Sequence, residues 1–143
     1  MDKKPFHILL VEDNPVDVDL TRRAFKTRKL INTVSVARDG EEALEQIHAW
    51  ESGETPPGLI LLDLNLPKVD GIDVLRQLKS HPRFRVIPVV VLTTSEDHAD
   101  LKRCYELGAN SYIVKPVDFK KFLDVVAQID LYWLLTNTPP QAD

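Results

Sequence analysis

The sequence predicts an α/β protein in which a parallel β-sheet carries helices on both faces. Three observations lead to this fold class. Apolar runs alternate with amphipathic stretches five times along the 143 residues. Each run is short and almost continuously apolar, which is typical of a strand buried on both faces. Turn-forming residues bound the runs, and strict alternation of strand and helix predicts parallel βαβ units.

The pattern assigns bounds to ten elements. The strands are predicted at 7–12, 33–37, 59–63, 88–93 and 111–115. The helices are predicted at 15–29, 41–51, 71–80, 97–107 and 118–135.

Local chemistry supports the first four helices. Asn14 is a suitable N-cap, and the proline that follows it suits a first helical position. Asp39 has the spacing of a capping box with Glu42, although Asp replaces the usual Ser or Thr. Ile72, Leu75 and Leu78 recur every three residues and predict the sheet-facing side of the third helix. Gly108 suits a left-handed C-cap after the fourth helix.

The last helix, 118–135, is apolar over much of its circumference, so we expect it to be buried on more than one side. It either folds onto its own domain or provides a surface for a partner or a second copy, and we favour the second interpretation. The segment 137–143 holds two prolines and is predicted to be disordered. We therefore expect one domain over 1–136.

Composition excludes several classes of protein. The net charge of −4 gives no reason to expect binding to nucleic acid or to an anionic membrane. The single cysteine, Cys104, excludes an intrachain disulfide and shares a helical stripe with Leu101 and Tyr105, which indicates a core-facing or half-buried position. No apolar stretch reaches membrane-spanning length, and the polar N-terminus lacks a signal-peptide core, so we expect a cytoplasmic protein.

Polar residues that could take part in a reaction lie at the ends of four of the predicted strands. Glu12 ends the first strand and Asp13 follows it, Asp63 ends the third, Thr93 ends the fourth and Lys115 ends the fifth. The carboxyl ends of parallel strands meet at one edge of a sheet, where ligands bind. Carboxylates about 4 Å apart repel by roughly 4 kcal/mol at an effective dielectric near 20, so a cation, a neighbouring ammonium group or protonation must compensate them.

This set of residues suits phosphoryl transfer to a carboxylate. Asp63 would be the nucleophile that forms an acyl phosphate. Mg²⁺ held by Asp13 and Asp63 would neutralise charge on the transferred group. Lys115 would balance the remaining charge, and the Thr93 hydroxyl could donate to a phosphate oxygen.

Five motifs occur in order: Ile8–Asn14, Leu61–Pro67, Asp70–Gly71, Leu92–Ser95 and Tyr112–Pro116. With these motifs the chain resembles, over roughly residues 6–130, the receiver domain of bacterial two-component response regulators. The resemblance implies a flavodoxin-like (βα)5 doubly wound sandwich whose five-stranded parallel sheet has the order 2-1-3-4-5.

The resemblance also implies the roles of the acidic residues. Asp63 is the phosphoacceptor and is loaded from a phosphohistidine on a sensor histidine kinase. Asp13, Asp63 and the backbone carbonyl of Asn65 bind Mg²⁺, or Mn²⁺ in its place, and Glu12 acts largely through bound water.

Further implied roles concern the switch. Thr93 moves toward the phosphoryl group and Tyr112 turns inward behind it, while Lys115 contacts the phosphoryl oxygens. The Lys115–Pro116 peptide bond is expected to be cis. Thr94 departs mildly from the family pattern, which prefers a smaller residue there, and Asn65 with Ser95 fills the two positions that tune autodephosphorylation.

The resemblance extends to the residues that would pass the signal on to a partner. Leu92–Ser95, Lys115–Asp118 and Tyr132–Leu134 most resemble single-domain regulators paired with bacterial and cyanobacterial phytochromes. The resemblance implies a homodimer formed by the fourth helix, the fifth strand and the fifth helix. We see no helix-turn-helix segment or basic stripe, and so expect no DNA binding.

Three other functions fit the sequence less well. A phosphatase of the haloacid-dehalogenase type needs an acid two residues after its nucleophile, where this chain has Asn65. A nucleotide or flavin module would need a glycine-rich phosphate loop, and the chain has five glycines and no such motif. A receiver that never accepts phosphate is disfavoured because the acidic set is intact.

Overall fold

The computed structural model describes residues 7–27, 33–93 and 98–114, together with Lys120, Asp124 and Ala127. Five parallel strands form one sheet in the order β2-β1-β3-β4-β5. Both the predicted fold class and the predicted strand order are thereby confirmed. The strands are β1 (Ile8–Val11), β2 (Val34–Ala37), β3 (Leu59–Asp63), β4 (Val89–Thr93) and β5 (Ser111–Val114).

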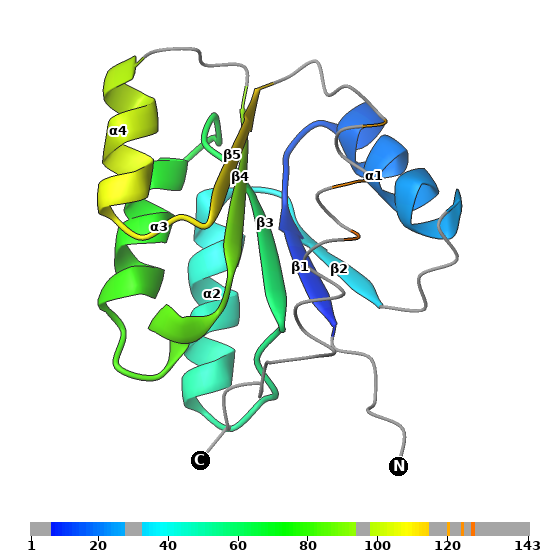
Figure 1. Cartoon of the computed structure of the whole chain (residues 1–143). Helices are drawn as coiled ribbons and strands as arrows, with labels where there is room; N and C mark the ends of the chain where they lie inside the picture. Colours follow the sequence, from blue (N-terminus) through cyan, green and yellow to red (C-terminus); the bar gives the residue numbers. More distant parts are fainter. Residues whose placement is uncertain are drawn as a thin grey trace.

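Helices lie on both sides of this sheet (Figure 1). The described helices are α1 (Pro15–Thr27), α2 (Gly40–Glu51), α3 (Gly71–Ser80) and α4 (His98–Glu106), with a 3₁₀ turn, η1 (Phe84–Val86), before β4. α1 covers one face, and α2, α3 and α4 cover the other.

Alternate residues of the inner strands enter two separate core clusters. Leu61 packs with Phe25 on the α1 side, whereas Leu62 packs with Trp50 and Phe84 on the opposite side. Every residue of β1 and β3 is buried. This burial explains why the strands are continuously apolar, since each side chain meets a helix on one face or the other.

The helix caps follow the predictions with one correction. Asn14 Oδ1 accepts a hydrogen bond from the Val16 backbone N–H at 2.9 Å, and Asp39 Oδ1 accepts one from the Glu42 N–H at 2.8 Å. In a capping box Glu42 would accept from the N–H of Asp39. It instead accepts from the N–H of Arg38 at 2.9 Å.

Two packing predictions need correction. Cys104 is fully buried, but Tyr105 is 50% exposed and does not share its stripe. In α3 the strongly buried positions are Val74, Leu75 and Leu78, and Ile72 lies at the margin of the core. The 3₁₀ turn was not predicted, since three residues are too few for a periodicity to appear.

Several predictions fall on residues that lie outside the described ones. Lys120, Asp124 and Ala127 are helical, in agreement with the predicted last helix, whose other residues are not described. Thr94, Ser95, the Lys115–Pro116 peptide bond and the segment 137–143 also lie outside. Across the residues described, no helix has the length and apolar character to cross a bilayer.

Candidate functional site

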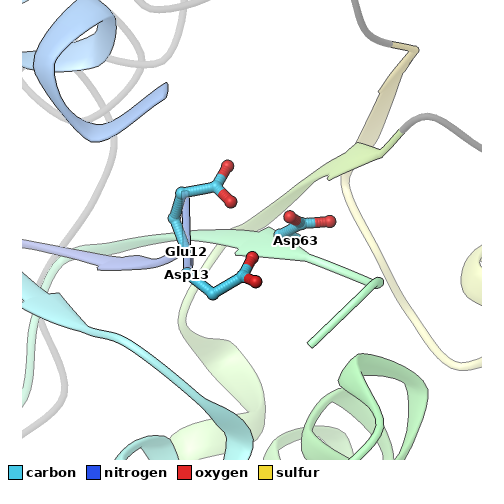
Figure 2. Close-up of side chains that lie close together, drawn as sticks. All are labelled: Glu12, Asp13 and Asp63. Atoms are coloured by element: carbon cyan, nitrogen blue, oxygen red, sulfur yellow. The ribbon is translucent and has the colours of Figure 1, made fainter. Parts of the chain in front are cut away.

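Three carboxylates meet at the carboxyl ends of β1 and β3 (Figure 2). One oxygen from each of Glu12, Asp13 and Asp63 lies within 4.8 Å of the others. The sheet register explains the meeting, because Val11 pairs with Leu62 and the next residues along the chain, Glu12 and Asp63, are therefore level. The predicted acidic cluster is thus present in the structure.

Two of these acids are removed from solvent. Glu12 is 1% exposed and Asp63 5% exposed, whereas Asp13 lies open at the rim. Burying like charges side by side is unfavourable unless an opposite charge compensates them. Carboxylate oxygens are the ligands preferred by hard divalent cations such as Mg²⁺. The donor set, its burial and its spacing therefore fit a divalent metal ion.

Backbone hydrogen bonds orient two of the carboxylates. Asp63 Oδ1 accepts from the N–H of Asn65 at 3.0 Å. Glu12 Oε2 accepts from the N–H of Asn14 at 3.3 Å. The side chain of Asn65 is exposed, so its contribution to the orientation of Asp63 comes from the main chain.

The neighbouring strand brings Thr93 to the same edge. Asp63 pairs with Leu92 in β4, and Thr93 follows it as the last residue of that strand. Thr93 in turn pairs with Val114, the last residue of β5. The backbone position of Thr93 agrees with the prediction, but its side chain and the whole of Lys115 lie outside the described residues.

Tyr112 occupies the middle of β5, opposite Val91. It is half-buried and packs at the edge of the core cluster beneath α2 and α3. It therefore does not lie in the acidic cluster itself. This placement is compatible with the indirect role that the family likeness implies for it.

The loop 64–70 joins Asp63 to α3 and is held tightly at both ends. The N–H groups of Leu66 and Gly71 both donate to the Leu64 carbonyl, at 3.1 and 3.2 Å. A Cβ atom on Gly71 would lie 2.5 Å from the Asp63 carbonyl oxygen, so only glycine fits there. Asp70 caps α3 by accepting from the Ile72 N–H at 2.9 Å.

Sequence reasoning missed the residues that brace this loop from outside. Lys68 Nζ lies 3.5 Å from oxygens of both Asp39 and Glu41 at the start of α2. The sequence signal for this bridge was weak, since it consisted of a lysine between Pro67 and the Asp70–Gly71 pair. Nothing in the spacing linked that lysine to an acid near position 40.

Comparison with known proteins places this geometry in context. The profile of the response regulator receiver domain matches residues 8–127. A probable methanogenesis regulatory protein, FilR2 of Methanothrix harundinacea, is 46% identical over 137 residues, which is 95% of this chain and 88% of that protein. Response regulator Rcp1 of Synechocystis is 43% identical and covers 96% of this chain and 95% of its own length.

Solved structures agree with the sequence comparison. The Mn²⁺-bound form of Rcp1 superposes with a TM-score of 0.79 at 41% identity, covering 95% of this chain and 99% of that structure. The phosphorylated cyanobacterial phytochrome response regulator RcpA gives a TM-score of 0.78 at 40% identity, covering 96% and 100%. These proteins share the fold across nearly the whole chain.

Proposed function

Because this chain belongs to the response regulator receiver domain family, we propose that it accepts a phosphoryl group on Asp63 from a sensor histidine kinase and passes on the signal by a change of surface. The observation that carries the proposal is the acidic cluster, in which Asp63 is buried and oriented beside Glu12 and Asp13. The solved structures similar to this chain include a cyanobacterial phytochrome response regulator and a bacteriophytochrome response regulator, so a phytochrome is the kinase that we propose.

The reaction we propose is a displacement at phosphorus. An oxygen of Asp63 forms the new bond to phosphorus, and the bond to the donor's imidazole nitrogen breaks with its electron pair going to nitrogen. The imidazole takes one proton from solvent, so the products are an acyl phosphate and a neutral histidine. Bound Mg²⁺ would offset negative charge on the transferred group. Its proposed ligands are Asp13, Asp63 and the Asn65 backbone carbonyl, with Glu12 acting through water.

Further residues would complete the site. The Lys115 ammonium would pair with phosphoryl oxygens, and the Thr93 hydroxyl would donate to one of them. Tyr112 would then follow Thr93 inward. Since the chain acts on its own phosphoryl group, we propose a signalling protein whose only chemical steps are phosphotransfer and autodephosphorylation.

The rim of the site offers a surface for the kinase. Val16 and Leu20 lie one turn apart on α1, next to the acidic end of β1, and are 64% and 42% exposed. A phosphohistidine can reach Asp63 only if the kinase approaches this rim. Exposed apolar side chains next to a reactive group suit such a transient contact.

The output surface that we propose consists of α4, β5 and the segment 118–135. On α4 a shallow groove of about 610 Å³ is lined by Leu101, Lys102, Tyr105 and Glu106. A second copy of the chain would cover this groove in the proposed homodimer. Residues 1–136 would then act as one receiver domain.

Acetyl phosphate, which replaces the kinase as donor, tests the proposal directly. With Mg²⁺ present, intact-protein mass spectrometry should show one phosphoryl group on the wild type and none on Asp63→Asn. A label that persists on Asp63→Asn would refute the assignment.

A further inference from the structure

We propose that Lys68 is a positioning residue, which holds the loop 64–70 in the shape that metal binding and phosphorylation at Asp63 require. This inference rests on the proposed function. It follows from the contacts of Lys68, from its backbone conformation and from the close packing of the loop.

The contacts tie the loop to the start of α2. Lys68 Nζ lies 3.5 Å from Asp39 Oδ2 and 3.5 Å from Glu41 Oε2. Asp39 is itself held in place, because it is the N-cap of α2 and its side chain is only 14% exposed. The N–H of Gly40 also donates to the Pro67 carbonyl at 3.4 Å. A side-chain bridge and a backbone bond therefore join the same two segments.

The backbone of Lys68 is unusual for a residue with a Cβ atom. Its φ is 69°, and among the described residues other than glycine no other φ is positive. Such a conformation is strained and persists only where its surroundings impose it. Glycine would adopt it without strain but would lack the bridge to Asp39 and Glu41. The bridge is a contact that can hold the lysine in this conformation.

Tight backbone packing passes the position of Lys68 on to Asp63. A Cβ atom on Gly40 would lie 2.1 Å from the Val69 carbonyl oxygen, which shows how closely the loop sits on α2. At its other end the loop touches the Asp63 carbonyl through Gly71, and the Asn65 N–H holds the Asp63 carboxylate. The loop has little free space in which to absorb a shift at Lys68, so the shift would reach these groups.

If Lys68 acted through its charge alone, its removal would change the metal affinity in the opposite direction from a loss of positioning. This difference makes the inference testable. Removing a positive charge near an acidic site should strengthen the binding of a divalent cation by Coulomb's law. Loss of positioning should weaken the binding. The direction of the change therefore separates the two effects.

The experiment compares the wild type with Lys68→Met, Lys68→Arg and Lys68→Gly. Mn²⁺ affinity is measured by titration calorimetry, and the phosphorylation rate is measured with acetyl phosphate. Arg76→Met is the matched control, since it removes a partly exposed cation that pairs with Asp73 on α3.

Lys68→Met should weaken Mn²⁺ binding by about twofold to fivefold, the range of an exposed ion pair. The phosphorylation rate should fall by a similar factor. Lys68→Arg should restore both, because it keeps the charge, and Arg76→Met should change neither. The deficit of Lys68→Met relative to the wild type should shrink in concentrated salt, which screens the bridge.

Unchanged or tighter Mn²⁺ binding by Lys68→Met would overturn the inference. Wild-type binding by Lys68→Gly would do the same, because that variant relieves the backbone strain but lacks the bridge. If Lys68→Met does not fold, the Mn²⁺ affinity of Lys68→Gly alone decides whether the bridge is needed. A wild type that takes no phosphoryl group would instead refute the proposed function.

Discussion

The backbone N–H of Asn65 donates to Oδ1 of Asp63 at 3.0 Å, so the residue two positions beyond the end of β3 orients the carboxylate that ends it. The same carboxylate lies beside Glu12 and Asp13 because β1 and β3 are neighbours in register. The local turn orients the Asp63 carboxylate, and the pairing of β1 with β3 brings that carboxylate close to Glu12 and Asp13.

Asp63 should be the residue that accepts the phosphoryl group. We expect the wild type to gain one such group from acetyl phosphate with Mg²⁺ and Asp63→Asn to gain none, as measured by intact-protein mass spectrometry. Asp73→Asn is the matched control, because Asp73 is an exposed acid of α3 that pairs with Arg76. Equal labelling of Asp63→Asn and Asp73→Asn would contradict the assignment.

Asp13→Asn should stabilise the metal-free protein and reduce its response to metal. Removing one of three clustered carboxylates relieves repulsion, and because Asp13 is exposed the gain in unfolding free energy should be about 1 kcal/mol. Mg²⁺ should then stabilise the variant less than the wild type, since a ligand is lost. Urea unfolding with and without MgCl₂ measures both effects. A metal-free variant less stable than wild type would argue against a repulsive cluster.

Gly71→Ala should damage both stability and the site. The added Cβ would lie 2.5 Å from the Asp63 carbonyl oxygen and 2.6 Å from the Leu64 Cα, and backbone cannot move aside as a side chain would. We expect a loss of about 1–3 kcal/mol in unfolding free energy and slower phosphorylation.

Gly53→Ala is the control for this substitution. Gly53 has a positive φ of 113° but no atom within 4 Å of its would-be Cβ. It should lose about 1 kcal/mol from backbone strain and keep its phosphorylation rate. Equal phosphorylation by Gly71→Ala and Gly53→Ala would show that close packing at Gly71 is not needed for the reaction.

Lys79 should make stability rise with pH in the alkaline range. Burial lowers the pKa of Lys79 from 10.5 to about 8, although its Nζ donates to the carbonyls of Arg85 and Ile87 at 3.0 and 2.7 Å. Between these two values the unfolded chain binds more protons than the folded chain, so the unfolding free energy increases with pH. Below pH 8 both states are charged and this increase is absent.

The increase should be roughly 1–3 kcal/mol, because the two carbonyls favour the ammonium and oppose the effect of burial. Urea unfolding at pH 7 and at successive higher values should show it in wild type and in Lys102→Met, which removes an exposed lysine that pairs with Glu106. Lys79→Met should lack it. Parallel pH profiles for Lys79→Met and Lys102→Met would contradict the prediction.

The chain should form a dimer through the α4 face. Tyr105 is half-exposed beside a shallow groove, and an acid in its place would bury a charge in the interface. We expect sedimentation at micromolar concentration to show a dimer for the wild type and a monomer for Tyr105→Asp. Leu20→Asp on α1 is the control and should still dimerise. A wild-type monomer, with and without a phosphoryl analogue, would argue against the interface.

Much of the fold could be predicted because short-range patterns specify it. The bounds of β3 and α3 were predicted without error, since a continuous apolar run and a three-residue apolar spacing are local signals. The capping roles of Asn14 and Asp39 were local as well. Tyr105 was assigned wrongly because periodicity alone cannot tell how wide a face the sheet covers.

The sequence by itself determined which segments are buried strands, where the helices start and which acids end the strands, because each of these depends on neighbours within a few positions. Only the tertiary structure decided that Glu12 and Asp13 lie beside Asp63 at such short range and that Lys68 reaches back to Asp39. Residues this far apart along the chain meet only when the whole sheet packs, and a pair of opposite charges 29 positions apart leaves no periodic trace.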